Sequence, residues 1–98
     1  MANQFGDRVR QLREQQNMLL RQVAPQLEMD TPQLSKIERG ERTAKKEQVN
    51  KLAEILKADK EELLTLWLAD QVYDVIKNED HANEALKSVS KKLKSKKK

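Results

Sequence analysis

Apolar side chains recur along most of this 98-residue chain at the three- and four-residue spacing of an amphipathic α-helix. Glycine and proline together occur only four times, so few positions interrupt that spacing. The length suits one small domain with a modest core. We therefore expect an all-α fold, with one or more helices that extend from its C-terminal end.

The predicted helices begin with two short ones. The first spans residues 3–16, and Asn17 is expected to end it because asparagine tolerates the left-handed backbone of a helix stop. The second lies in residues 20–27, where Pro25 removes one backbone hydrogen bond and crowds the preceding turn. The proline leaves three forms open: a very short helix, a kinked helix, or one that starts late enough to place Pro25 in its first turn.

Clearer signals bound the third helix. Asp30 is a good N-cap residue, and Pro32 falls in the first turn, where a missing N–H costs little. Gly40 follows the last apolar position as a helix stop. After a polar loop, the apolar spacing predicts a fourth helix at about residues 46–57.

The C-terminal third of the chain continues the helical pattern. A fifth helix is expected to begin at Asp59, with Glu62 in a capping-box position. Its apolar stripe covers residues 63–76, about four turns, which is longer than a small domain needs to close its own core. A weaker stripe at 82–93 predicts a sixth helix, and the lysine-rich segment 94–98 is expected to be disordered.

Charge is segregated along the chain. Residues 36–46 carry five basic and two acidic side chains, a local charge of +3, whereas residues 47–84 carry four lysines against ten acids, a local charge of −6. Six further lysines lie in residues 91–98 and account for the net charge of +4. A short basic patch on an acidic body is typical of a protein that presents one face to a polyanion, although chance on a solvated surface explains such a run equally well.

Several function classes lose support. The chain has no cysteine and a single histidine, His81, in a polar run, so we expect no metal site and no cofactor. No signal-peptide core and no apolar run of the ~20 residues that span a bilayer is present, which predicts a cytoplasmic protein with no membrane partner. No nucleophile with its base, metal-ligand cluster or Gly-rich phosphate loop is evident, so we do not expect an enzyme.

The second and third predicted helices, joined by a tight turn, describe a helix-turn-helix. The segment 24–40 resembles the Cro/CI-type (XRE) helix-turn-helix family of transcriptional regulators. The residues that carry the resemblance are Ala24, Leu27, Met29, Leu34 and the ending Ser35-Lys36-Ile37-Glu38-Arg39-Gly40, with further matches at Val9, Leu12, Arg13, Val49, Leu52, Ala53, Leu56, Asp59, Glu62, Leu63 and Leu64.

The resemblance implies a five-helix lambda-repressor-like domain at 1–66, with 67–93 as a helical extension. It also implies a recognition helix at about 31–39 that enters the major groove of double-stranded DNA. The base-contacting residues carried over are Thr31, Pro32, Gln33 and Lys36; the phosphate-contacting residues are Arg21, Arg39, Arg42, Lys45 and Lys46; the structural ion pair is Arg13 with Glu38.

Three positions depart from the family pattern. Leu19 and Leu20 stand where the family often has Ser-Gln, so an N-cap and a phosphate contact are missing, and Arg21 is the expected substitute. Glu28 replaces the glycine of the turn and must adopt whatever backbone the turn requires. Pro25 is unexpected in the second helix. These departures concern the DNA contacts of the second helix rather than the fold.

The 63–76 stripe has two interpretations. In the first, the stripe forms a homodimer interface through Leu64, Trp67, Leu68 and Val72, which would place two recognition helices on a palindromic operator. In the second, residues 82–93 fold back and cover the stripe within one chain. We favour the dimer. Size and architecture resemble restriction–modification controllers and phage-type repressors alike, and the small core leaves no obvious room for an effector.

Two other functions compete with the regulator. An antitoxin-like protein would bind a protein partner through residues 67–98, while its helix-turn-helix regulates its own promoter. Association of residues 82–98 with an anionic membrane is less favoured, because the apolar face of that segment is thin.

Overall fold

The computed structural model describes residues 3–96, and the secondary structure in that range is entirely helical. This confirms the expected all-α fold. No helix in the described range is long and apolar enough to cross a membrane. The elements are α1 (Gln4–Gln15), α2 (Leu20–Val23), the 3₁₀-helix η1 (Ala24–Leu27), α3 (Thr31–Glu38), α4 (Lys46–Ile55), α5 (Lys60–Ile76) and α6 (Ala82–Lys96).

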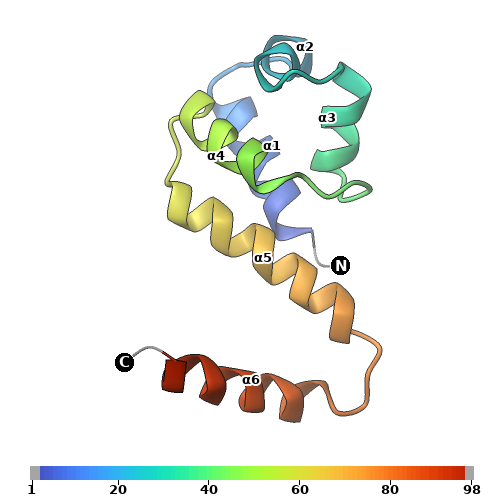
Figure 1. Cartoon of the computed structure of the whole chain (residues 1–98). Helices are drawn as coiled ribbons and strands as arrows, with labels where there is room; N and C mark the ends of the chain where they lie inside the picture. Colours follow the sequence, from blue (N-terminus) through green and yellow to red (C-terminus); the bar gives the residue numbers. More distant parts are fainter. Residues whose placement is uncertain (1–2, 97–98) are drawn as a thin grey trace.

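The helices from α1 to the first half of α5 surround one apolar core. The second half of α5 runs out of this domain, and α6 turns back below it (Figure 1). Each element from α2 to α3 contributes buried side chains to this core, which explains how these short helices are held against the domain. The buried apolar residues are Phe5, Val9, Leu12, Val23, Ala24, Leu27, Met29, Leu34, Ile37, Ala44, Val49, Leu52, Ala53, Leu56 and Leu63.

Pro25 shapes the second helix by shortening it. α2 ends at Val23, and the chain tightens into η1 with Pro25 in its first turn, where no N–H is needed. Glu28 then adopts the left-handed backbone, with φ of 57°, that the turn requires and that the family meets with glycine. Of the three forms left open by the sequence, the structure therefore has the very short α-helix, continued by a 3₁₀ turn.

Both ends of α3 carry the expected signals. The Asp30 carboxylate accepts a hydrogen bond from the Gln33 N–H at 2.8 Å, which caps the first turn. At the other end, Gly40 has φ of 77°, its N–H donates to the Ile37 carbonyl, and the Glu41 N–H donates to the Lys36 carbonyl at 2.8 Å. This pair of bonds is a Schellman motif, for which a glycine is well suited.

α5 begins and α6 ends somewhat differently from the sequence-based prediction. Asp59 caps α5 by accepting from the Glu61 N–H at 2.9 Å, and Glu62 instead lies 3.2 Å from Arg8 in an ion pair. α6 continues to Lys96, so the segment 94–96 is helical, while Lys97 and Lys98 lie outside the described residues. No residue of α6 is buried.

The N-terminal segment joins three helices. The Asp70 carboxylate of α5 accepts from the backbone N–H groups of Gln4 (3.2 Å) and Phe5 (2.9 Å), and so caps the positive N-terminus of α1. Asn3 Nδ2 donates to the Glu38 carbonyl at 2.8 Å, at the last turn of α3. Gly6 lets α1 approach that turn closely, because a Cβ there would collide with the carbonyl oxygens of Glu38 and Ile37.

We expect Gly6→Ala to lower the free energy of unfolding by about 1–3 kcal/mol, because the added methyl group must displace the end of α3. Alanine is otherwise the better helix former, so helix propensity alone predicts the opposite sign. Urea denaturation followed by circular dichroism measures the change. Gln15→Ala, at an exposed position of the same helix, is the control, and a Gly6→Ala protein as stable as this control would refute the close approach.

Candidate nucleic-acid interface

α3 has one buried and one exposed face. Its Leu34, Ile37 and Glu38 are buried against the domain. Pro32, Lys36 and Arg39 follow one another at helical spacing on the opposite side, and all three are exposed. Glu38, the only acid within α3, is thus turned inward. The charged residues on the exposed face, Lys36 and the C-cap residue Arg39, are both basic.

The residues predicted to touch base edges all lie on α3. Lys36 and Pro32 stand on the exposed face, whereas Thr31 and Gln33 lie at its edges and are partly buried. The Gln33 N–H is used by the Asp30 cap, which leaves the side-chain amide as its recognition group. The four residues therefore occupy the N-terminal two turns, the part of a recognition helix that enters a groove.

Three basic residues follow α3 in the chain, and we call them the rim. Arg42 lies in the loop after α3, Lys45 is the N-cap of α4, and Lys46 is the first residue of that helix; all are exposed. Lys45 lines the same shallow hollow as Glu28, and so lies beside the turn that precedes α3. Arg21 is exposed on α2, on a different element from the other three.

Arg39 is held by two neighbours for which the sequence predicted no such contact. Its Nε and Nη2 donate to the Glu41 carboxylate at 2.9 and 3.1 Å, and its Nη1 donates to Ser35 Oγ at 2.6 Å. The hydrogen bond from Arg39 lowers the pKa of the Glu41 carboxyl, with a smaller contribution from the charge of Lys36. Glu41 therefore partly neutralises the basic face in the free protein. Its only signal in the sequence was its position two residues after Arg39.

The expected ion pair anchors the inner side of α3. Arg13 Nε and Nη2 donate to the two Glu38 oxygens at 2.7 and 3.0 Å, and both side chains are buried. Arg13 Nη1 donates further to the Met18 carbonyl at 2.8 Å, in the turn between α1 and α2. The hydrogen bond with Glu38 raises the pKa of Arg13. One guanidinium thus joins α1, the following turn and α3.

The start of α2 compensates in part for its missing N-cap. Leu19 has no acceptor side chain, but the Gln22 side-chain oxygen accepts from the Leu19 N–H at 2.7 Å. This bond closes the first turn from the helix side. The bond uses only the oxygen of the Gln22 amide.

The four residues of the expected dimer interface divide into two pairs. Leu64 and Trp67 pack against the core, and Trp67 Nε1 donates to the Ala44 carbonyl at 2.8 Å. Leu68 and Val72 lie farther along α5 and are 56% and 40% exposed. α6 folds back toward them without burying either, so the C-terminal segment leaves the stripe open.

Comparison with known families gives one result. A family model described as a helix-turn-helix domain matches residues 4–66, more than half of the chain. The match takes in α1 to α4 and ends within α5, before Trp67. Comparisons with curated proteins and with solved structures give no match.

We expect Glu38→Ala to lower the free energy of unfolding by roughly 3–5 kcal/mol, because it strands the buried charge of Arg13. Replacing both partners, by Arg13→Met with Glu38→Leu, should restore most of that stability. Urea denaturation measures both variants. Glu14→Ala is the control, since it removes an exposed ion pair with Arg10 and should cost no more than about 1 kcal/mol. Equal losses for Glu38→Ala and Glu14→Ala would contradict the anchoring role.

Proposed function

Because the chain belongs to the helix-turn-helix domain family, we propose that it is a sequence-specific, DNA-binding transcriptional regulator of the Cro/CI type. It places α3 in the major groove of double-stranded DNA. The observation that carries this proposal is the exposed face of α3, which presents Lys36 and the C-cap residue Arg39, whereas the acid of the helix, Glu38, is buried. It acts in the cytoplasm and needs no cofactor.

Base recognition falls to the first two turns of α3. Lys36 is long enough to reach the N7 and O6 acceptors of guanine, and the Gln33 amide matches the N6 and N7 edge of adenine. Thr31 offers a hydroxyl, or a methyl group for thymine, and Pro32 offers apolar contact only. Lys36 carries most of the discrimination in this proposal, because it is fully on the exposed face.

Phosphate binding falls to the rim. In this proposal the phosphates are bound by Arg42, Lys45 and Lys46, which are exposed in the loop after α3 and at the start of α4, and by Arg21, which is exposed on α2. Such contacts supply affinity that depends on salt and hold the protein in register. Arg39 joins them by exchanging the Glu41 carboxylate for a phosphate oxygen. The proposed operator is palindromic and bound by a homodimer, as in restriction–modification controllers and phage-type repressors.

Selection from a randomised pool of double-stranded DNA, followed by sequencing, tests the proposal. The wild-type protein should enrich a two-fold symmetric site. Lys36→Ala should remove the preference for one base at one position of each half-site, which is worth roughly 1–3 kcal/mol of discrimination between bases. Arg39→Ala should lower the affinity for all DNA sequences alike. Lys60→Ala, which removes an exposed lysine at the start of α5, is the control and should retain the wild-type site. The proposal fails if no sequence is enriched or if Lys36→Ala leaves the site unchanged.

Glu41→Gln should strengthen binding to specific and unrelated DNA alike, by roughly two- to fivefold, because it releases Arg39 from an exposed ion pair and removes a negative charge. Fluorescence anisotropy over a range of salt concentrations measures this effect, and the salt dependence should steepen. Glu54→Gln, an exposed acid of α4, serves as the matched charge control. Weaker binding by Glu41→Gln would mean that the carboxylate orients Arg39 rather than competing for it.

A further inference from the structure

The last helix, α6, is strongly basic, and its charge is not neutralised within the chain. Residues 85–96 carry five lysines and no acid, and Glu84 in the first turn is the only acid of the helix. All five lysines are exposed, and within residues 3–96 none of them forms an ion pair. The match to the helix-turn-helix family ends at residue 66, so the family does not account for this charge.

Three of these lysines form a row along one side of α6. Lys87, Lys91 and Lys94 follow one another at four- and three-residue spacing, so their side chains share a face of the helix. The row extends over about 10 Å, because each helical residue adds about 1.5 Å. The apolar side chains of Val89 and Leu93 lie on the opposite side. We name these three residues the lysine row.

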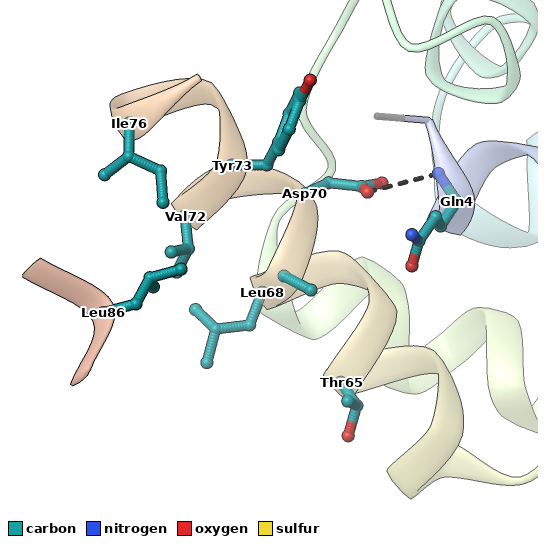
Figure 2. Close-up of a pocket in the computed structure, with 9 residues that line it drawn as sticks. Gln4, Thr65, Leu68, Asp70, Val72, Tyr73, Ile76 and Leu86 are labelled. Atoms are coloured by element: carbon teal, nitrogen blue, oxygen red, sulfur yellow. Dashed lines mark hydrogen bonds between the residues drawn. The ribbon is translucent and has the colours of Figure 1, made fainter. Parts of the chain in front are cut away.

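The apolar side of α6 is turned toward α5. Figure 2 shows Leu86 reaching toward Val72 at a groove of about 740 Å³ that both residues line. The lysine row therefore faces away from α5, into solvent. It stays accessible when the apolar side chains are covered in the homodimer of the proposed function.

The two basic surfaces of the chain are separated. Residues 36–46 have a charge of +3, residues 47–84 a charge of −6, and residues 85–96 a charge of +5. Figure 1 shows α6 at the opposite end of the molecule from α2 and α3. The acidic stretch between them repels phosphates, so the two basic regions do not form one continuous track for a polyanion. The charge distribution instead provides two separate places for one.

We infer that the lysine row is a second binding site for double-stranded DNA, one that reads no sequence, and that the protein bridges two duplexes. Exposed lysines neutralise phosphates and release counterions without contacting base edges. Because the row faces outward at the end of the molecule far from α3, it reaches a duplex other than the one that α3 holds. The bridge rests on the proposed binding of DNA by α3; the site on α6 does not.

Double-stranded DNA fits the lysine row better than an anionic membrane does. A helix that lies on a membrane buries its apolar side in the lipid, with its lysines on the polar face. The apolar side of α6 is directed toward α5 instead, where Leu86 lines the groove. The attraction that remains is electrostatic alone. DNA satisfies it without insertion, because a duplex carries one negative charge for about every 1.7 Å of its axis.

Capture of one duplex by another tests the inference with the full chain. A duplex of unrelated sequence is fixed to beads, and retention of a second, fluorescent duplex is measured with the protein present. The wild-type protein should retain it, and the combined Lys87→Gln, Lys91→Gln and Lys94→Gln variant should retain roughly tenfold less or lower, because three phosphate contacts are lost. Arginine at the same three positions keeps the charge and should keep the capture.

A matched variant controls for net charge. Lys51→Gln, Lys57→Gln and Lys60→Gln together remove the same three charges from exposed positions outside α6, and capture should stay near the wild-type level. Equal losses in the two glutamine variants, or undiminished capture by the α6 variant, would overturn the second site. A wild-type protein that retains no second duplex would overturn the bridge.

The remaining outcomes separate this inference from the proposed function and from a membrane. An α6 variant that loses capture but still enriches the two-fold site from the randomised pool supports the inference and leaves the regulator standing. Capture that depends on the lysine row, with no site enriched by the wild-type protein, supports the inference and rejects the regulator. Sedimentation with phosphatidylglycerol vesicles that depends on the row, without capture of DNA, would overturn the inference.

Discussion

The buried pair of Arg13 and Glu38 is the interaction on which the arrangement of this domain depends. A carboxylate in a small apolar core is tolerated only where its oxygens are satisfied, and the Arg13 guanidinium satisfies both while also binding the Met18 carbonyl. The pair fixes the rotation of α3 about its own axis. Because Glu38 is turned inward, the opposite face of the helix presents Pro32, Lys36 and Arg39. One buried contact therefore determines which side chains face a ligand.

The N-terminal segment connects α3 to the rest of the chain. Its contacts reach α3 through Asn3 and α5 through the backbone N–H groups that Asp70 caps. Gly6 is needed because α1 and the last turn of α3 approach more closely than a side chain at this position allows. The end of α3 and the middle of α5 are thus joined through the same few residues, by hydrogen bonds between the side chains of Asn3 and Asp70 and the backbone rather than by a flexible linker.

Local signals predicted much of this fold from the sequence. The helical apolar spacing, the Asp30 cap, and the Gly40 stop each act within a few residues, and the structure follows them. Contacts between distant residues were harder to predict. Pro25 could be assigned no single form because the outcome depends on the core around it, and nothing in the sequence indicated that Trp67 would donate to the Ala44 carbonyl instead of facing outward. At the candidate site, the family motif identified Lys36 and Arg39, whereas Glu41 and Ser35 emerged only from the side-chain positions.

The two surfaces of the chain differ in the physics of what they would bind. The rim around α3 is basic, and an interaction with phosphate there weakens as salt rises. The second half of α5 and α6 expose apolar side chains instead, among them Leu68, Val72 and Val89, and an interaction there would be driven by removing apolar surface from water. In the homodimer of the proposed function, binding of the second half-site is intramolecular, which multiplies the affinity of α3 without any new base contact. Affinity would then be shared between a salt-sensitive DNA interface and an apolar protein interface. The internal pair of Arg39 and Glu41 belongs to the first, because it is exposed and competes with phosphate for the same guanidinium.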